Sequence, residues 1–521
     1  MRTLILFLLA VLPAAAQATK PITIDSLRDK VAGGWAGQMI GVSYGAPTEF
    51  RFNSRMIPDD QMPKWKPEMV SNSIDQDDLY VDMTFAQVLD DKGLDATTED
   101  FGAMFREAKY RLWHANLAAR RALRRGVPAS LSGTPKYNIH ANDIDFQIEA
   151  DFVGLMAPGL PVAATDIAWR AGRVMNYGDG IYGGIFVSCM YSAAFFDSNP
   201  RRIVEAGLAC LPRKSPYAQL IADVLQWHRQ NPNDWKRTWQ LIEDKWNHRD
   251  PCPEGALRDF NIDAKINGAY IALGLLYGNG DFGQTIVIST QAGQDSDCNP
   301  SNAAGILGVA MGYNAIPENW KSGIPAVADK TFSYTNFTFK TITESTLNRA
   351  IALAEKTGGK RQGDTLLVKT QAPKATRLEM WDDYGSPVER IEIADPRFRR
   401  TGTWEPGRND AMISSEKGAT AEIEFEGTGF ILVGQFLPDG GMADVMVDGQ
   451  HAATIDVYPD EDSMKNRESL HHAFKLKPGK HTVRLTVRGE RYKDTRLTVR
   501  GERYKDSKGS KISLQGLVVF R

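Results

Sequence analysis

Two hydrophobic periodicities divide the chain into two parts. Between about residues 24 and 356, apolar side chains recur at three- and four-residue spacing, as in segments 79–89 and 203–211. This spacing predicts helices, and strand-like alternation is scarce in the same region. Beyond residue 376 the period changes to two, as in segment 421–425, and short apolar runs are separated by turn residues. The pattern predicts an all-α domain over residues 24–356 followed by an all-β sandwich over residues 377–521.

Two segments interrupt this pattern. Residues 357–376 are polar and contain Gly358-Gly359, so we expect a linker between the two domains. Within the β-rich part, residues 484–494 recur letter for letter as residues 496–506. An offset of twelve residues preserves strand parity, so either copy can occupy the same strand position. We expect one copy to pair in the sheet and the other to lengthen a hairpin or bulge out.

The N-terminus has the features of a secretory signal peptide over residues 1–16. Arg2 is followed by an apolar run over residues 4–12 and by small residues that permit cleavage near Ala16-Gln17. The run is shorter than the ~20 apolar residues that span a bilayer. We therefore expect a secreted or periplasmic protein with no integral membrane segment. In that environment cysteines can pair, and the sequence leaves open which of them do so, if any: Cys189, Cys210, Cys252 and Cys298.

Composition excludes several classes of protein. Hydrophobic residues make up 42% of the 521 positions, so the chain as a whole is not disordered. The 62 basic side chains are balanced by 64 acidic ones, which argues against a nucleic acid partner. The histidines show no zinc-type spacing with the cysteines. No G-x-S-x-G motif of a serine hydrolase is present.

Two acidic segments have the composition of a metal site. Asp77 and Asp78 open one predicted helix, and Asp295 and Asp297 lie on a loop that enters another. Carboxylates are the hard oxygen ligands that Mg²⁺ or Ca²⁺ requires, and four of them suffice for one or two ions. The alternative is that these aspartates only cap their helices, where they interact with free N–H groups and the helix dipole.

A third acidic segment supplies candidates for acid/base chemistry. Asp145 and Glu149 are four residues apart, so they share a face if the segment is helical, and Asp143 and Asp151 flank them. The alternative is a solvated helix face. Further along, Asp179 lies between Tyr177 and Tyr182 in a glycine-rich stretch. These three side chains either line a pocket or form part of a turn.

At these residues the sequence resembles the ADP-ribosylglycohydrolase family, from about Ser26 to Trp320. The family has a G-D-x-x-G-x-x-x-E pattern, then T-D-D-T at a helix start, then G-D-T-D-T before a small-residue helix, and an I-P-x-x-W ending. The matching segments in this chain are residues 41–49, 76–79, 294–298 and 316–320.

The resemblance implies an all-α fold with a binuclear magnesium, sometimes manganese, centre. It implies that the metal ligands are Asp77, Asp78, Asp295 and Asp297, and that Glu49 is a candidate acid/base. In the family the metals grip ribose hydroxyls and help to orient water at the anomeric carbon. We accordingly expect one or two divalent ions, with Mg²⁺ first and Mn²⁺ or Ca²⁺ as alternatives.

The chain departs from the family pattern at several positions. Val42 replaces an acid, Gln76 and Leu79 replace both threonines of T-D-D-T, and Cys298 replaces the last threonine of G-D-T-D-T. Threonines at these positions ligate or support the metals, so the departures bear on the second ion and on the substrate.

These observations lead to a ranked set of functions. The first is a secreted, divalent-metal-dependent glycoside hydrolase acting on an extracytoplasmic glycan or other glycoside, with a furanoside suggested by the family's ribose. Its catalytic candidates are Glu49, Asp143, Asp145, Glu149 and Asp179, and its substrate-binding candidates are Gln76, Asp151, Tyr177, Tyr182, Gln294 and Asn299. One alternative is an ADP-ribosyl hydrolase that releases ADP-ribose from a protein or small molecule. The other is a non-catalytic glycan-binding protein.

The predicted sandwich looks like the accessory modules of secreted carbohydrate-active enzymes, of jelly-roll or galactose-binding-like type. Trp381, Tyr384 and Trp404 either stack on sugars there or serve as core and interdomain anchors. The oligomeric state is left open by the sequence.

Overall fold

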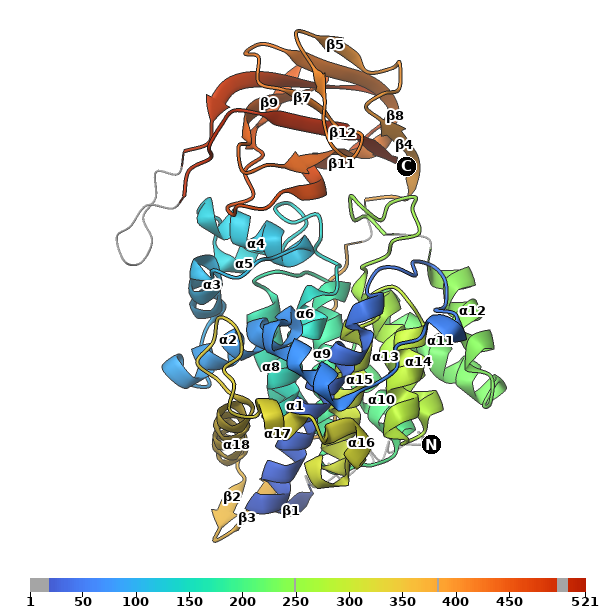
Figure 1. The fold of residues 1–521 in the computed structure, drawn as a ribbon, viewed down its shortest axis with the longest axis vertical. Helices are drawn as coiled ribbons and strands as arrows, with labels where there is room; N and C mark the ends of the chain where they lie inside the picture. Colours follow the sequence, from blue (N-terminus) through green and yellow to red (C-terminus); the bar gives the residue numbers. More distant parts are fainter. Residues whose placement is uncertain (1–17, 248–249, 382–383, 494–504) are drawn as a thin grey trace, which may run out of the picture.

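The computed structural model describes residues 18–247, 250–381, 384–493 and 505–521. A helical domain is followed by a domain of antiparallel β-sheet, which lies above it in Figure 1. The predicted order of an all-α and then an all-β domain is confirmed. The predicted signal peptide and most of the second copy of the repeat, residues 496–504, lie outside the described residues.

Helices make up the first domain. They are α1 (Ile24–Gly45), α2 (Asp77–Lys92), α3 (Thr98–Glu107), α4 (His114–Arg124), α5 (Ala129–Ser132), α6 (Asp145–Ile148), α7 (Asp151–Leu155), α8 (Pro161–Gly172), α9 (Asp179–Ala194), α10 (Pro200–Ala209), α11 (Pro216–Gln230), α12 (Trp235–Trp246), α13 (Ala264–Gly278), α14 (Phe282–Gln291), α15 (Cys298–Met311), α16 (Glu318–Lys321), α17 (Ile324–Val327) and α18 (Phe339–Lys356), with 3-10 turns η1 (Ala46–Thr48), η2 (Asp59–Gln61), η3 (Pro67–Asp75) and η4 (Tyr313–Ala315). Helices α9, α13 and α15 are buried around nearly their whole circumference, as expected of helices at the centre of a core.

A stripe of glycines joins α1 to α15. On α1 a glycine recurs every fourth residue, and a Cβ at any of these positions would overlap the backbone at α15 or at the loop entering it. The two backbones therefore touch directly. This contact places η1 next to the loop before α15, and the hydroxyls of Thr48 and Ser296 lie 2.9 Å apart there. The glycines are Gly33, Gly37, Gly41 and Gly45.

The predicted linker contains a hairpin, which corrects the interpretation of residues 357–376 as linker throughout. Strands β2 (Lys360–Gln362) and β3 (Thr365–Lys369) pair with each other, and β3 also pairs with β1 (Thr19–Thr23). Leu366 and Val368 alternate into the core, a short period-two signal within a polar stretch.

The C-terminal domain is a nine-stranded antiparallel sheet within the described residues. Its order is β10-β9-β11-β8-β12-β7-β6, with β4 also on β12 and β5 on β8. Residues 484–491 of the first copy lie in β11, where Arg484 to Thr486 pair with both β8 and β9, so the expectation that one copy joins the sheet is confirmed. The strands are β4 (Pro387–Glu392), β5 (Arg399–Thr401), β6 (Glu405–Pro406), β7 (Met412–Ser414), β8 (Thr420–Phe436), β9 (Gly441–Val447), β10 (Gln450–Asp456), β11 (Lys465–Arg491) and β12 (Ile512–Phe520).

Arginines at the end of α4 and directly after it attach the helical domain to the sheet. Arg125 pairs with Asp456 at 2.7 Å and with Asp460 at 2.6 Å, and Arg121 also reaches Asp456 at 3.1 Å. The Arg121 guanidinium lies 3.7 Å from the centre of the Phe436 ring. In Figure 1, α4 and α5 form the part of the helical domain next to the sheet. The two domains are therefore joined by a partly buried, charged interface.

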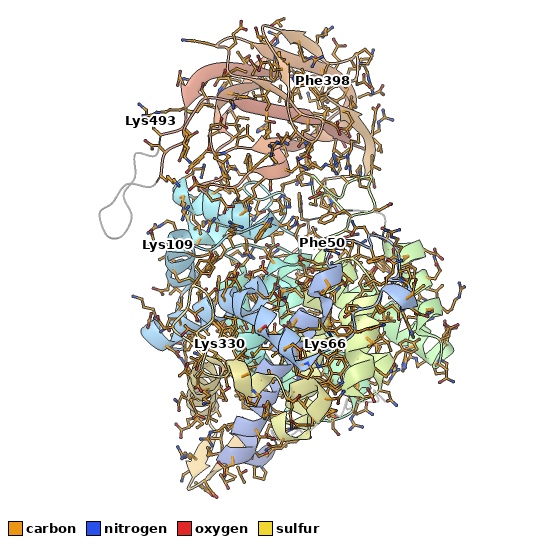
Figure 2. All side chains as sticks on the ribbon, in the orientation of Figure 1. Phe50, Lys66, Lys109, Lys330, Phe398 and Lys493 are labelled. Atoms are coloured by element: carbon orange, nitrogen blue, oxygen red, sulfur yellow. A yellow bond between two sulfur atoms is a disulfide. The ribbon has the colours of Figure 1, made fainter. Side chains whose placement is uncertain are left out.

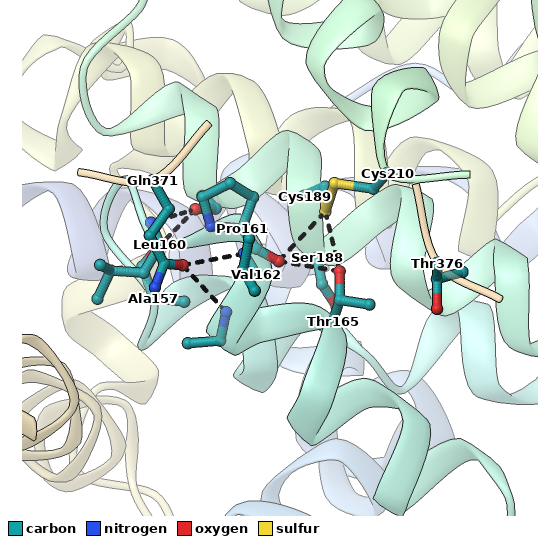
Figure 3. Close-up of a disulfide and its surroundings, with 12 residues drawn as sticks. Ala157, Leu160, Pro161, Val162, Thr165, Ser188, Cys189, Cys210, Gln371 and Thr376 are labelled. Atoms are coloured by element: carbon teal, nitrogen blue, oxygen red, sulfur yellow. Dashed lines mark hydrogen bonds between the residues drawn. A yellow bond between two sulfur atoms is a disulfide. The ribbon is translucent and has the colours of Figure 1, made fainter. Parts of the chain in front are cut away.

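One pair of cysteines forms a disulfide. Cys189 in α9 is bonded to Cys210 at the end of α10, next to Thr165 (Figure 3). Cys252 and Cys298 are buried and free. Among the described residues, none of the helices is both long enough and apolar enough to span a membrane.

Candidate active site

The four aspartates named from the sequence meet Glu49 at one place. Asp77 and Asp78 are the first residues of α2, and Asp297 is the residue before α15. Ligand atoms of Glu49, Asp295 and Asp297 lie within 4.8 Å of one another, as do those of Asp78, Asp297 and Cys298. We call Glu49, Asp77, Asp78, Asp295 and Asp297 the acidic cluster.

Burial and mutual repulsion disfavour ionisation in the acidic cluster. Asp78, Asp295 and Asp297 are at most 2% exposed, and burial raises the pKa of each well above its usual range. The nearby charge of Asp297 adds to this effect at Asp78. Glu49 is open to the pocket, and there the charge of Asp297 is the main cause that raises its pKa to about 9.

Unsatisfied oxygens show that the acidic cluster fits a divalent cation. The Oδ1 atoms of Asp78, Asp295 and Asp297 are buried and receive no hydrogen bond from any described residue. Buried carboxylate oxygens are costly when left without a donor or a cation. Several carboxylate oxygens that converge without donors are a suitable ligand set for a hard ion such as Mg²⁺. Asp78, Asp295 and Asp297 would hold it, with Glu49 and Asp77 at its open side.

Cys298 faces the acidic cluster where the family has a threonine. Its thiol donates to Asp78 Oδ2 at 3.3 Å. The thiol thus replaces a hydroxyl next to the hard oxygens, and sulfur is a poor ligand for Mg²⁺. Gln76, which replaces the first threonine of the separate T-D-D-T pattern, lines the pocket instead.

The acidic cluster forms one wall of a pocket of about 880 Å³. This volume lies within the range of ligand-binding pockets. Aromatic rings line it from several elements: Phe50, Tyr80, Trp113 and Phe260. Phe50 lies at the end of the helical domain that faces the sheet (Figure 2). The pocket therefore combines carboxylates with flat apolar surfaces.

The β domain contributes to the same pocket through Arg467 of β11. The pairing of β11 with β8 is irregular between Lys465 and Glu468, and Arg467 there has a φ of 54°. Such an irregularity redirects a side chain out of the sheet. Lys465 lies 4.2 Å from the centre of the Trp113 ring. The pocket is thus built by both domains.

The third acidic segment supports the pocket more than it lines it. Asp145 reaches the pocket, but its carboxylate accepts hydrogen bonds from the backbone N–H groups of Ala115 and Asn116 at the start of α4. Glu149 accepts from the Asn116 side chain. Burial raises the pKa of Asp145 to about 6 and that of Glu149 well above its usual range. Both carboxylates therefore hold α4 in place.

Asp143 and Asp151 lie away from the pocket lining. Asp151 accepts a hydrogen bond from Asn302 of α15 at 2.8 Å and is fully buried. Asp143 faces His140, with 2.6 Å between its Oδ2 atom and His140 Nδ1. The expectation that Asp143 performs acid/base work in the pocket and Asp151 binds substrate there is corrected by these positions.

The glycine-rich stretch at residues 176–182 also lies elsewhere. Tyr182 donates from its hydroxyl to the carbonyls of Arg377 and Glu379, so it anchors the segment that leads to the β domain. Tyr177 lines a separate cleft. Asp179 starts α9 and accepts from the N–H of Tyr217 at 3.3 Å. The turn interpretation therefore replaces the pocket interpretation for these residues.

Gln294 and Asn299 are buried and do not line the pocket. Gln294 accepts from the N–H of Asn261 at 2.9 Å and donates to the carbonyl of Asp259 at 3.0 Å. Asn299 donates to the side chain of Asn267 at 2.9 Å. Both residues satisfy polar groups of neighbouring loops, so their predicted substrate contacts are corrected to structural ones.

Sequence reasoning missed much of the pocket lining. Most of the missed residues lie at or beside α4, on the loop over residues 254–262 and on β11, and no motif marks these segments; Tyr80 lies on α2, just after the motif at residues 76–79. The rings predicted as sugar platforms or anchors, Trp381 and Tyr384, are buried in a cluster that also contains residues of the helical domain. Trp381 and Tyr384 therefore occupy the positions of interdomain anchors. The missed residues include Tyr80, Trp113, His114, Asn116, Arg258, Phe260 and Arg467.

A helical domain whose helix starts bring carboxylates to one pocket has the architecture of a metal-binding enzyme. The model of the ADP-ribosylglycohydrolase family matches residues 23–359, more than half of the chain. The chain therefore belongs to the ADP-ribosylglycohydrolase family, a family of hydrolases whose members typically bind divalent metals.

The chain is similar to three known proteins, among others. An A type blood alpha-D-galactosamine galactosaminidase of Flavonifractor plautii is 31% identical over 103 residues, which are 19% of this chain and 9% of that protein. The solved ADP-ribosylglycohydrolase-related protein complex has 17% identity and a TM-score of 0.39, covering 63% of this chain and 98% of its own. The CBM36-1 domain of a multidomain xylanase from the hindgut metagenome of Trinervitermes trinervoides has 12% identity and a TM-score of 0.17. This match covers 25% of this chain and 94% of that domain.

Proposed function

We propose that the protein is a secreted, divalent-metal-dependent glycoside hydrolase that cleaves a glycosidic bond in an extracytoplasmic glycan. The observation that carries this proposal is the acidic cluster, with its unpaired buried oxygens, on the wall of an aromatic-lined pocket. Cleavage of an acetal needs charge that stabilises an oxocarbenium-like transition state and a group that exchanges a proton with the leaving oxygen or the attacking water. The pocket contains residues suited to both tasks.

The deeper carboxylates are suited to metal binding. Asp78, Asp295 and Asp297 are the buried ligand candidates, and Asp77 is partly open to the pocket. A divalent ion, when bound there, supplies positive charge next to the sugar hydroxyls and the attacking water. The orphaned oxygens of this chain then gain a partner, and the repulsion between the carboxylates is relieved.

Glu49 is the candidate acid/base. It is the one exposed member of the acidic cluster, so a substrate can reach it. With its pKa raised to about 9, Glu49 holds a proton at neutral pH and can donate it to a leaving oxygen. Positive charge at the ligands would lower that pKa and favour the role of base. Asp145 is a poorer candidate because two backbone N–H groups already occupy its carboxylate.

The walls of the pocket suit a sugar. Phe50, Trp113 and Phe260 present apolar rings, and sugars pack their C–H faces on such rings. The galactosaminidase among the similar proteins adds support for a glycoside as the substrate. The suggestion of a furanoside rests on the ribose in the family's name.

The location outside the cytoplasm has two supports. The N-terminal segment has signal-peptide features, and the Cys189–Cys210 disulfide belongs in an oxidising compartment.

The test is a substrate screen with the mature protein from Gln17 onward. Aryl furanosides, aryl pyranosides, oligosaccharides and ADP-ribosylated arginine are each incubated with Mg²⁺ or Mn²⁺, with and without a chelator. We expect turnover of a glycoside that the chelator abolishes, and no turnover by Asp295→Asn/Asp297→Asn. Release of ADP-ribose without any glycosidase activity would instead establish the second candidate.

That second candidate, an ADP-ribosyl hydrolase, is favoured by two cations in the pocket. Arg258 and Arg467 both line it and could contact a diphosphate. Each already faces a carboxylate, Glu392 at 3.3 Å and Glu254 at 4.0 Å, which weakens this case. A third possibility, glycan binding without catalysis, requires binding that Asp297→Ala leaves unchanged in a protein that turns over none of the substrates.

A further inference from the structure

Four side chains with soft and borderline ligand atoms meet beside the pocket, outside the acidic cluster. His114, His140, Asp143 and Cys252 each offer one ligand atom, and all four atoms lie within 4.8 Å of one another. His140, Asp143 and Cys252 are at most 2% exposed. The residues come from the start of α4, from the loop before α6 and from the loop after α12.

The atoms of this group converge on a single point. His140 Nδ1 is 2.6 Å from Asp143 Oδ2 and 3.5 Å from the Cys252 sulfur, and His114 Nδ1 is 3.7 Å from the same Asp143 oxygen. A Cys–His–Asp relay would place the cysteine and the aspartate at opposite nitrogens of the ring. Here both approach Nδ1, which excludes that relay and leaves a common centre among the four atoms.

We propose that His114, His140, Asp143 and Cys252 bind a zinc ion. Zinc is typically bound by four ligands in a tetrahedron, at about 2.0–2.1 Å from nitrogen and about 2.3 Å from sulfur. Those bond lengths separate neighbouring ligand atoms by roughly 3.3–3.8 Å, close to two of the three distances described above. Imidazole and thiolate favour zinc, whereas the oxygen-only acidic cluster favours Mg²⁺.

The surroundings of His140 match those of a metal-bound histidine. Its other nitrogen, Nε2, lies 3.5 Å from a carboxylate oxygen of Glu468 in β11 and has no hydrogen bond from the described residues. Histidine ligands usually direct their second nitrogen to a carboxylate, which fixes the ring orientation. The side chain of Asn138 also accepts from the backbone N–H of His140. The free Oδ1 of Asp143 is buried without a partner.

Zinc at this place would act on the pocket through its wall. The loop that carries Cys252 continues into Leu257 and Phe260, which line the pocket, and the Phe260 ring stacks on His114 at 5.7 Å. Four protein ligands leave no open position, so the ion would hold this wall and would not contact the substrate. The zinc-binding residues are therefore positioning residues. This inference does not depend on the proposed function.

The test measures metal on the full mature chain in excess Mg²⁺, which fills an oxygen-ligand site. The protein is loaded with Zn²⁺ for elemental analysis, and with Co²⁺ for its absorption spectrum. We expect about one zinc ion per chain, tetrahedral Co²⁺ bands in the visible and a thiolate charge-transfer band in the near ultraviolet. Cys252→Ser removes the charge-transfer band, and His114→Gln lowers zinc affinity by about 10-fold or more.

Cys298→Ser is the matched control, because Cys298 is the other buried free cysteine and faces the acidic cluster. The proposal requires that this variant keep the charge-transfer band. Loss of the band in Cys298→Ser but not in Cys252→Ser would place the ion in the acidic cluster and overturn the proposal. A wild-type chain that binds no zinc would also overturn it. His114 is the most exposed of the four ligands, so His114→Gln provides a result if Cys252→Ser fails to fold.

Discussion

The carboxylates at the starts of α2 and α15 are held where their charge is unfavourable. Asp78, Asp295 and Asp297 are buried close together, and burial is the main cause that raises the pKa of each. In the metal-free protein they therefore retain protons that the unfolded chain releases. This difference couples stability, pH and metal binding at the same residues.

The metal-free protein should lose stability as the pH rises. Between the ordinary carboxyl value of 4.5 and about 9, the folded state holds a proton on Glu49 that the unfolded state has released, so the free energy of unfolding falls with pH. Mg²⁺ competes with these protons. We expect the rise in Tm on adding Mg²⁺ to be larger at pH 8 than at pH 6, measured by differential scanning fluorimetry. An equal rise at both pH values, or a rise that persists in Asp295→Asn/Asp297→Asn, would contradict this.

Glu49→Gln should separate catalysis from metal binding. The amide cannot exchange the proton, so kcat should fall by about 10²- to 10⁴-fold while the metal content stays at the wild-type level. Glu68→Gln, at an exposed acid on η3, is the control. If Glu49→Gln loses the ion together with the activity, Glu49 is a ligand and the acid/base must be another residue.

At the scale of elements, the contact of α1 with α15 sets the position of the acidic cluster. The glycine stripe brings the end of α1 to the residues before α15, and this places Glu49 within reach of Asp295 and Asp297. A side chain in the stripe would have to push the two backbones apart. The geometry of the candidate metal site therefore depends on positions that carry no functional group.

Gly41→Ala should be destabilising although it adds only a methyl group. Its Cβ would overlap the carbonyl of Pro300 in α15, and backbone cannot yield as a side-chain tip can. We expect a loss of about 2 kcal/mol or more in the free energy of unfolding, measured by urea denaturation. Metal affinity should fall in the same variant. Ser26→Ala, on the exposed side of α1, should change neither quantity. A wild-type value for Gly41→Ala would mean that the helices can separate freely.

Particular elements show how far the sequence could predict this fold. The change from a three-to-four to a two-residue period predicts both domains, because each period reports one buried face. The motifs around Asp77 and Asp297 lead to the acidic cluster, because each lies at a helix start. The hairpin of β2 and β3 escapes prediction because only Leu366 and Val368 carry its pattern. His140 and Cys252 are 112 residues apart, and only tertiary packing brings them together.

At the scale of the whole molecule, the β domain is part of the pocket and not a freely tethered module. Arg467 lines the pocket, and Glu468 faces His140. Arg121 of α4 and Arg125 directly after it hold the two domains together, and His114 and Asn116 of the same helix line the pocket. Removal of residues 377–521 should therefore disturb the pocket as well as the interface.

Asp456→Asn should weaken the interface between the domains. Asp456 accepts from both Arg121 and Arg125, and its side chain is only 10% exposed. Breaking such a partly buried pair removes the carboxylate that faces Arg121 and leaves Arg125 with Asp460 alone, at a cost of about 3 kcal/mol. We expect calorimetry to show a lower Tm or two separate transitions. Asp462→Asn, at an exposed ion pair with Lys505, should stay within about 0.5 kcal/mol of wild type.

The long sequence separation within the acidic cluster has a consequence for the choice of ion. Asp78 and Cys298 touch although they are 220 residues apart in the sequence, so the unfolded chain has no preformed site. If the N-terminal segment directs export, a chain that crosses the membrane unfolded assembles its ligands only afterwards. The site would then select its ion from the medium in which the protein finally folds, and the metal supply of the cytoplasm would have no influence on that choice.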